Sequence, residues 1–339
     1  MKIWFTTTEN GDNAQVVQHL LTLARKSIQG EFNTRYKLAK SPDEADIIVY
    51  IESSSAKLKK YVYALLSEEL ILKYPNRCFV IDCSDTSWEI MPGCYTALRL
   101  SQVNRKRFRS GGYLIEYNPL CEKIYQENKD IEPKLLFSFR GSASSPFRKK
   151  LFEANFSASN ISIQQIEKWF NHSTDELLLY AEEIINSKFV LCPRGICPAS
   201  IRLFETMRMG RVPIILSDEW VAPEGLAWQD FSIRLSETRI HELPEIIKAY
   251  EPDSFKMGNL AREAWENWFS PDVIYVRMLN YIESIFLERD INHDEKVYQK
   301  EWLSYKFQWE RGWTPVQIAA RYARQGQLIK KLKSKFQLP

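Results

Sequence analysis

The sequence predicts an α/β fold with two successive parallel-sheet layers. Short β-rich runs alternate with amphipathic helical stretches over the first 130 residues, and a second alternating series follows between about residues 135 and 216. Such alternation is typical of parallel sheets whose two faces are covered by helices. The chain has 339 residues, of which 45% are hydrophobic and 26% charged, which suits two globular domains with sizeable cores.

The first series gives strands at 2–7, 46–52 and 78–83, separated by helices at about 12–29 and 55–73. A further strand is expected at 94–100. Residues 103–112 are rich in basic side chains and end in a Gly-Gly pair. We interpret them as a solvated loop or as the wall of a site. A hinge is expected at 130–133.

The second series gives strands at 135–139, 161–163, 189–192 and 212–216, and helices at about 146–154, 174–186 and 199–209. Ser173 and Glu176 have the spacing of a capping box, in which side chains satisfy the free N–H groups at a helix start. The expected domains are therefore residues 1–132, residues 133–290 and a set of basic C-terminal helices at 291–339. Two similar halves facing one another would enclose a cleft, where small ligands preferentially bind.

Charge is distributed unevenly along the chain. Residues 296–339 hold 10 Lys or Arg and 2 Asp or Glu, against 36 and 41 in residues 1–295. The body therefore carries a net charge of about −5, which argues against nucleic acid as a partner, because a nucleic-acid binder needs a basic surface. The basic tail interleaves its charges with Trp302, Tyr305, Phe307 and Trp309. This composition favours either packing against the first domain or peripheral contact with an anionic membrane.

The cellular location of the protein and the redox state of its cysteines are inferred from features that the sequence lacks. No apolar run approaches the ~20 residues needed to cross a bilayer, and residues 2–6 look like a strand rather than a secretory leader. We therefore expect a cytoplasmic protein that can work at the inner face of the membrane. The six cysteines lack the spacing of zinc knuckles, so reduced thiols and no structural metal are expected.

The segment from Phe189 to Asp218 carries the main functional signal. A buried strand is expected to end at Pro193, turn at Gly195 and lead into a helix that starts near Ser200. In such strand-loop-helix units, ligands sit beyond the carboxyl ends of the strands, where the first N–H groups of the helix attract anions. The segment therefore predicts an anion site.

The helix within this segment has two distinct arcs. A turn of 100° per residue groups Ile201, Leu203, Phe204 and Met207 on one arc and Arg202, Glu205, Thr206 and Met209 on the other. The second arc suits a nucleoside diphosphate, with Ser200 and Arg202 near phosphate oxygens and Glu205 accepting hydrogen bonds from ribose hydroxyls. A surface ion pair between Arg202 and Glu205, three residues apart, is the alternative.

These motifs resemble the exostosin-like glycosyltransferases. The resemblance rests on Pro193-Arg-Gly195, on Ser200-x-Arg-Leu-x-Glu205 and on Gly210-x-x-Pro-Ile-Ile-x-Ser-Asp218, with weaker similarity at 135–141 and 243–247. It covers roughly residues 135–270. It implies a GT-B fold, in which two Rossmann-like domains face one another across a cleft. The nucleotide sugar would bind the C-terminal domain and the acceptor the N-terminal one, with inversion at the anomeric carbon.

The resemblance also implies roles for individual residues. It matches Arg140 and Arg202 to basic residues near the diphosphate, Ser200 to a helix-start hydroxyl and Glu205 to the acid that binds ribose. Gly141, Arg194 and Gly195 fall within its matching turns. The implied co-substrate is a nucleotide diphosphate sugar, with UDP favoured, and the acceptor is a glycan or glycolipid. No two aspartates are separated by one residue, so we expect no metal and no other cofactor, with arginines and helix N–H groups stabilising the leaving diphosphate.

Three aspartates are candidates for the catalytic groups. Asp82 and Asp85 follow a predicted strand of the first domain, and Asp218 follows the last strand of the second. A turn-forming role is the alternative for the first two. Glu9 and Asp12 are similar candidates after the first strand. Two other functions stay open: a fucosyltransferase-like enzyme that uses a GDP-sugar, and a non-catalytic subunit that stabilises a partner synthase.

Overall fold

The computed structural model describes residues 1–9, 14–53, 59–85, 88–116, 118–154, 156, 158–167, 173–290, 292–310 and 314–324. The chain divides into two compact units: residues 1–55 with 79–288, and residues 56–78 with 289–339. Each unit is described by itself. The candidate Asp12 lies outside the described residues.

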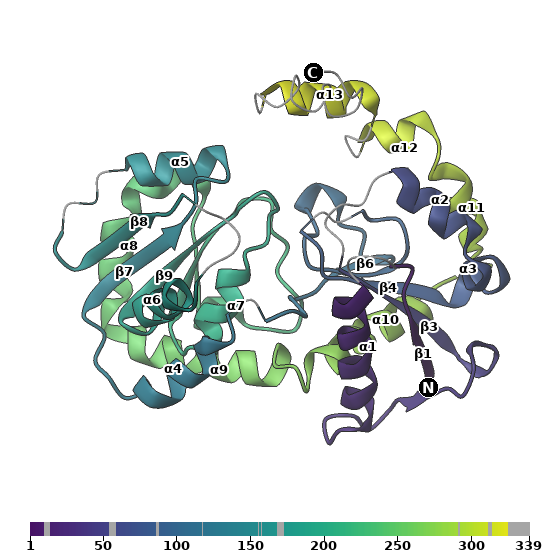
Figure 1. Cartoon of the computed structure of the whole chain (residues 1–339), viewed down its shortest axis with the longest axis horizontal. Helices are drawn as coiled ribbons and strands as arrows, with labels where there is room; N and C mark the ends of the chain where they lie inside the picture. Colours follow the sequence, from purple (N-terminus) through teal and green to yellow (C-terminus); the bar gives the residue numbers. More distant parts are fainter. Residues whose placement is uncertain are drawn as a thin grey trace. The chain divides into compact units, whose positions relative to one another are not determined.

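The larger unit begins with a six-stranded sheet in the order β2-β1-β3-β4-β5-β6 (Figure 1). Its strands are β1 (Lys2–Thr6), β2 (Lys37–Leu38), β3 (Ile47–Glu52), β4 (Cys78–Asp82), β5 (Gly93–Tyr95) and β6 (Phe108–Ser110). β1 pairs in parallel with β2 and β3, and β5 pairs in parallel with β4 and β6. Every residue of β3 and β4 is buried, as expected for parallel strands covered on both faces. Helix α1 (Ala14–Gln29) packs on β1 and β3, and α10 (Ile274–Leu287) packs on β5.

The second sheet of this unit has five parallel strands in the order β11-β10-β9-β7-β8 (Figure 1). Its strands are β7 (Leu135–Gly141), β8 (Ile161–Gln165), β9 (Ser187–Pro193), β10 (Val212–Leu216) and β11 (Ile233–Arg234). The helices around it are α4 (Leu120–Asn128), α5 (Pro146–Glu153), α6 (Thr174–Ile185), α7 (Ile201–Arg208), α8 (Leu243–Tyr250) and α9 (Ser254–Trp268). The predicted α/β class, with two parallel sheets of Rossmann-like type as in the GT-B fold, is confirmed. The predicted domain bounds stay a prediction.

Most of the expected elements are present near their predicted positions. The capping box at the start of α6 is confirmed, because Ser173 and Glu176 exchange the two hydrogen bonds that define it. The interpretation of 103–112 as a solvated loop is wrong for its second half, since β6 lies there and residues 107–112 are buried. Arg107 donates to the carbonyl of Ile90 over 3.0 Å, and Arg109 lies 3.6 Å from Glu288. Both arginines are therefore held within the fold rather than in water.

Helix α7 ends at a tight contact with α9. Gly210 has a φ of +63°, a conformation that favours glycine, and it turns the chain from α7 toward β10. A Cβ placed on Gly258 would lie 2.4 Å from the carbonyl oxygen of Gly210. The missing side chain of Gly258 thus lets α9 approach the end of α7 closely.

A carboxylate ties α4 to both of these helices. Glu122 of α4 accepts hydrogen bonds from Arg208 of α7 over 3.1 Å and from Arg262 of α9 over 2.9 Å. Partial burial alone would raise the pKa of Glu122, but the hydrogen bonds from Arg262, Gln126 and Arg208 outweigh it and lower the pKa to about 2. The ionised form of Glu122 therefore stabilises the packing around α7.

The smaller unit is helical in its described part. It contains α2 (Lys59–Ser67), α3 (Glu69–Lys73), α11 (Glu295–Glu301), α12 (Tyr305–Glu310) and α13 (Pro315–Arg324). The side chain of Asn76 accepts a 2.8 Å hydrogen bond from the backbone N–H of Glu295, and Trp302 is 1% exposed. The C-terminal helices thus pack against the segment around Asn76. Among the described helices, none combines the length and the apolar composition that crossing a membrane requires.

Adding a methyl group at Gly258 should loosen the support of α7. We expect Gly258→Ala to lower the free energy of unfolding by about 1–3 kcal/mol, because the new Cβ overlaps the Gly210 carbonyl. Gly30→Ala is the matched control, since a Cβ there would lie 3.4 Å from the carbonyl oxygen of Ser27 and the cost should stay within about 0.5 kcal/mol. Urea unfolding of both variants measures the difference, and equal stabilities would contradict the close contact.

The Glu122 cluster should make stability depend on acidity. Its contribution is fully present above the ordinary pKa of 4.5 and is lost as pH falls toward the folded value of about 2. We expect Glu122→Gln to cost about 2 kcal/mol at neutral pH, after allowance for partial solvent exposure, and less than half of that near pH 3.

Urea unfolding at both pH values measures this loss. Glu263→Gln is the control, because the Glu263 side chain is exposed on the same helix α9 as Arg262. A penalty for Glu122→Gln that is unchanged at acidic pH would show that the carboxylate charge is not what stabilises the cluster.

Candidate functional site

A cavity of about 390 Å³ lies within the larger unit, beyond the carboxyl ends of strands from both sheets. From the first sheet its walls include residues that follow β3, β4 and β6, namely Ser53, Asp85 and Tyr113. The second sheet and the helices and loops around it contribute a larger set of lining residues, namely Arg140, Gly141, Arg148, Tyr180, Gly195, Cys197, Ser200, Arg202 and Glu205. Seven of the ten predicted site residues therefore line one cavity. It lies beyond the carboxyl ends of the strands, as the sequence analysis predicts.

Arg202 is a buried cation of the cavity wall. Its side chain is on the first turn of α7 and is only 8% exposed. Nη2 donates to the carbonyl oxygen of Arg140, and the guanidinium lies over the rings of Phe139 at 4.5 Å and Tyr180 at 5.3 Å. Nη1 has no hydrogen-bond partner within the described part of the chain. A buried donor without a partner costs about 1–3 kcal/mol, so this atom indicates where an anionic ligand would bind.

Gly141 makes room for this guanidinium. A Cβ at Gly141 would lie 3.3 Å from Nη2 of Arg202 and 3.1 Å from the ring of Phe139. A larger residue would therefore push Arg202 away from the end of β7. The neighbouring Arg140 is paired with Glu183 of α6, with nitrogen–oxygen distances of 2.9 and 2.8 Å. The charge of Arg140 is thus already balanced by an acid of the fold.

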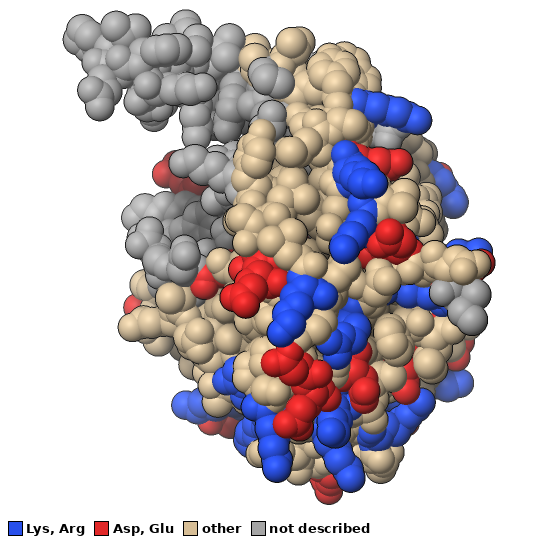
Figure 2. All heavy atoms as spheres, turned by 90° about the vertical axis from the view of Figure 1, so that its right-hand side faces the viewer, with Lys and Arg blue, Asp and Glu red and all other residues tan. Residues whose placement is uncertain are grey.

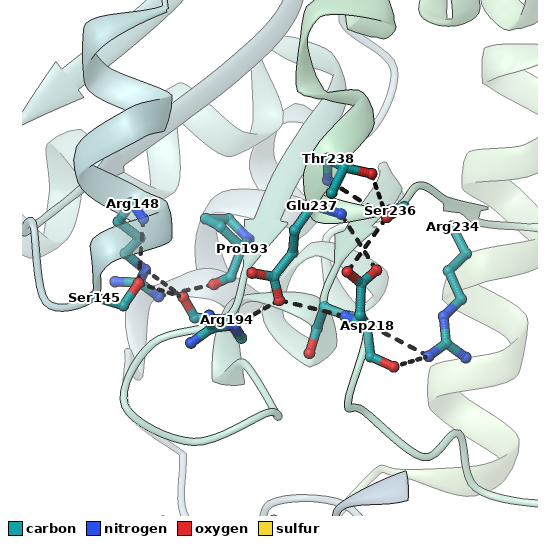
Figure 3. Close-up of polar contacts among 10 residues, drawn as sticks. Ser145, Arg148, Pro193, Arg194, Asp218, Arg234, Ser236, Glu237 and Thr238 are labelled. Carbon is teal, nitrogen blue, oxygen red and sulfur yellow. Dashed lines mark hydrogen bonds and ion pairs between the residues drawn. The ribbon is translucent and has the colours of Figure 1, made fainter.

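Arg148 is a second cation beside Arg202 that the sequence analysis missed. It lies on the first turn of α5 and donates to the carbonyls of Pro193 and Arg194 over 3.0 and 3.1 Å (Figure 3). Burial and the nearby charge of Arg202 lower the pKa of Arg148 to about 10. Both guanidiniums face the ring of Phe139. The sequence contains a pattern that could have identified Arg148. It is a basic residue near the start of a helix that follows a strand, and the same pattern identified Arg202.

Glu205 lies one turn after Arg202 and is 6% exposed. One oxygen accepts a 2.6 Å hydrogen bond from the hydroxyl of Tyr180, and the other accepts a 3.2 Å bond from the backbone N–H of Asn118. Burial raises the pKa of Glu205, while Tyr180, Arg202 and Asn118 act in the opposite direction. The alternative interpretation, a surface ion pair with Arg202, is not what the structure shows, because both side chains are buried and each has other partners. The other residues of that arc, Thr206 and Met209, are fully buried as well.

Asp85 is the predicted aspartate that reaches the cavity. Its Oδ1 accepts a 2.9 Å hydrogen bond from the hydroxyl of Tyr113, and the thiol of Cys197 lies 3.4 Å from the same oxygen. Burial raises the pKa of Tyr113 well above its ordinary value, so its hydroxyl keeps the proton that it donates. The sequence analysis predicts neither Tyr113 nor Cys197 as a site residue. Tyr113 follows β6, which the sequence analysis interprets as a loop or a site wall, and Cys197 is considered there only as a reduced thiol.

Three predicted site residues lie away from the cavity lining. Asp82 is 2% exposed and accepts hydrogen bonds from the backbone and side chain of Ser84. Arg194 pairs with Glu237 at 2.5 Å, and Asp218 accepts hydrogen bonds from Ser236 and from the backbone of Glu237 (Figure 3). Arg194 and Asp218 therefore hold the loops after β9 and β10 to the start of a 3-10 helix at Glu237–Glu242. The geometry gives them a structural role.

The arrangement suits a polyanion that also carries hydroxyl groups. Arg202 and Arg148 place two positive charges at one end of the cavity, and the helix start at Ser200 adds backbone N–H groups of the same polarity. Beside them, the buried carboxylate of Glu205 is a hydrogen-bond acceptor. In the described ranges, no group of three or more His, Cys, Asp or Glu side chains is placed to hold a metal ion.

Comparisons with known proteins identify related sequences. Residues 103–250 match the family described as the Exostosin GT47 domain. An Exostosin-1 homolog of Caenorhabditis elegans is 39% identical over 70 residues, which cover 20% of this chain and 18% of that protein. A probable glycosyltransferase of Arabidopsis thaliana is 26% identical over 260 residues, which cover 66% of this chain and 48% of that protein. The chain therefore spans less than half the length of these two relatives.

Among solved structures, Anabaena HepE in complex with UDP matches with a TM-score of 0.36 and 10% identity, over 81% of this chain and 84% of that one. A TM-score this low carries no argument about the site, and the fold assignment rests on the two parallel sheets. The family match includes the cavity-lining residues from Tyr113 to Glu205. The resemblance to the exostosin-like glycosyltransferases that the sequence motifs indicated is therefore confirmed.

Proposed function

We propose that this protein is an inverting, metal-independent glycosyltransferase. It moves a hexosyl or pentosyl group from a nucleotide diphosphate sugar to a glycan or glycolipid acceptor. The observation that carries the proposal concerns Nη1 of the buried Arg202, which has no partner in the described part of the chain. In the same cavity, one helical turn away, the buried carboxylate of Glu205 is a hydrogen-bond acceptor. The relatives' names, an exostosin homolog and a probable glycosyltransferase, support the same reaction class.

The donor would bind along the second sheet. Arg202 and Arg148 contact the diphosphate, because guanidinium groups form strong charge-assisted hydrogen bonds with phosphate oxygens. Ser200 and the first N–H groups of α7 add donors at the same end. Each oxygen of Glu205 uses one lone pair for Tyr180 or Asn118 and keeps another, so the carboxylate can accept hydrogen bonds from both ribose hydroxyls.

The reaction would be a direct displacement at the anomeric carbon. The acceptor oxygen forms the new bond from the face opposite the diphosphate, and the bond to the leaving oxygen breaks with its electron pair passing to the diphosphate. Arg202 and Arg148 stabilise the negative charge that develops there. Asp85 takes the proton of the acceptor hydroxyl, with the hydrogen bond from Tyr113 holding its side chain in place.

Removing the Arg202 guanidinium should weaken nucleotide binding strongly. We expect Arg202→Ala to lower the affinity for UDP by about 10- to 100-fold, since a charge-assisted hydrogen bond contributes about 1.5–3 kcal/mol. Isothermal titration calorimetry with UDP and GDP measures the effect. Arg239→Ala is the control, because Arg239 forms an exposed ion pair with Glu242 outside the cavity lining.

The same titrations separate the competing functions. UDP should bind more tightly than GDP, and the reverse order would favour a fucosyltransferase-like enzyme. No binding of either nucleotide at millimolar concentration, together with a stable complex with another transferase, would favour a non-catalytic subunit. Equal affinities of wild type and Arg202→Ala would refute the donor site.

Replacing the proposed base should stop turnover without harming donor binding. We expect Asp85→Asn to lower kcat by about 100-fold or more, because the amide cannot take the acceptor proton. UDP affinity should stay within about twofold. Release of UDP from a UDP-sugar, with an acceptor that the wild type glycosylates, measures kcat.

Asp230→Asn, which changes an exposed aspartate outside the cavity lining, is the control. Full activity of Asp85→Asn would remove Asp85 from the mechanism. It would leave the Arg202 and Glu205 site intact.

A further inference from the structure

Tyr180 joins the acid and the cation that α7 presents to the cavity. Its hydroxyl donates a 2.6 Å hydrogen bond to one carboxylate oxygen of Glu205, and the guanidinium of Arg202 lies over its ring at 5.3 Å. All three side chains line the cavity. Burial raises the pKa of Tyr180 well above its ordinary value, so the hydroxyl remains a hydrogen-bond donor at neutral pH. One tyrosine therefore contacts both of the groups that the proposed function assigns to the nucleotide.

The carboxylate of Glu205 is held from two other segments of the chain. Tyr180 reaches one oxygen from α6, and the backbone N–H of Asn118 donates to the other over 3.2 Å. The side-chain amide of Asn118 donates in turn to the carbonyl of Leu177 on α6 over 2.8 Å, and Asn118 is 1% exposed. The segment at Asn118, α6 and α7 thus meet around one carboxylate. Both oxygens of Glu205 are thereby oriented.

A buried carboxylate fixed in this way is selective about the groups that it accepts. Glu205 is 6% exposed, and burial raises its pKa because water is largely excluded from the charged group. Each oxygen keeps one acceptor position after the bonds from Tyr180 and Asn118. The two adjacent hydroxyls of a ribose supply donors for both positions. A 2′-deoxyribose supplies only one, and it leaves the other position unsatisfied in a site with little water.

A purely structural role for the Tyr180 hydroxyl fits less well. Tyr36 illustrates such a role, because its hydroxyl donates to the carboxylate of Glu283 over 2.9 Å, and Arg35 pairs with the same carboxylate at 2.9 Å. These three residues lie outside the cavity lining. Tyr180 and Glu205 instead meet on the wall of a space of about 390 Å³, which has room for a ligand.

We propose that Tyr180 is the positioning residue that makes this cavity select ribonucleoside diphosphates over their 2′-deoxy counterparts. Its hydroxyl orients Glu205 for the two ribose hydroxyls, and its ring supports the guanidinium of Arg202 at the diphosphate. The selection acts on the bound nucleotide before any transfer step, so it requires neither a particular sugar nor an acceptor. Because it concerns a bound nucleotide, it rests on the proposed function.

Isothermal titration calorimetry of the full chain with UDP, 2′-deoxy-UDP and inorganic pyrophosphate tests this selection. We expect the wild type to bind UDP at least about tenfold more tightly than 2′-deoxy-UDP. Tyr180→Phe, which removes only the hydroxyl, should lower that ratio at least about threefold and leave the affinity for pyrophosphate within about twofold. Tyr180→Leu should lower the ratio as well and should also weaken pyrophosphate binding, because the ring beside Arg202 is lost.

Tyr36→Phe is the matched control, because it removes a hydroxyl that donates to a glutamate outside the cavity lining. It should leave all three affinities unchanged. Basic and acidic side chains are intermingled on the face drawn in Figure 2, so the described residues there offer phosphates no surface of a single charge. A thermal melt confirms that each variant is folded.

The outcomes separate this selection from the proposed function. UDP binding by the wild type with a ratio near 1, or a ratio that both Tyr180 variants leave unchanged, would overturn the selection and leave the proposed function standing. The same loss in Tyr36→Phe would also overturn it, since the effect would then not belong to the cavity. Absence of UDP and pyrophosphate binding to the wild type would overturn the proposed function, and the selection with it.

Discussion

The architecture of the cavity depends on one buried guanidinium. Arg202 is fixed by the carbonyl of Arg140 and by the faces of Phe139 and Tyr180, and one of its nitrogens has no partner among the described residues. The surrounding fold serves this position: Gly141 leaves the space, and Glu122 and Gly258 hold α7 against its neighbours. A stable fold rarely leaves a buried donor unsatisfied, so a donor of this kind on a cavity wall calls for an explanation, and a bound anion is one.

The electrostatics of the site divide it into two sides. Burial is the main reason why the pKa of Arg148 falls to about 10, and the nearby charge of Arg202 lowers it further. Arg140 differs, because Glu183 balances its charge. Arg148 and Arg202 therefore form the cationic side of the cavity, whereas the first sheet contributes a carboxylate, Asp85, and hydroxyl groups. Such a division matches a reaction in which one reactant gains negative charge and the other loses a proton.

Local patterns predicted much of this arrangement, and long-range contacts account for what they missed. The strands around α7 and the placement of Arg202 and Glu205 follow from hydrophobic periodicity and from the sequence at a helix start. The burial of Arg109 depends on Glu224 and Glu288, which are more than 100 positions away, so no local pattern could reveal it. Likewise, Arg194 and Asp218 have the sequence context of site residues, but Glu237 and Ser236 from a later segment engage them. Tyr180 belongs to the site only because α6 packs close enough for its hydroxyl to reach Glu205.

The segment that leads from the first sheet to the second contacts two acids of the cavity, one from each sheet's side. Tyr113 holds the carboxylate of Asp85, and the backbone of Asn118, five positions later, holds the carboxylate of Glu205. If Glu205 binds the ribose and Asp85 takes the proton, as proposed, this segment connects the two substrate positions, and the donor is expected to bind before the sugar chain that it extends.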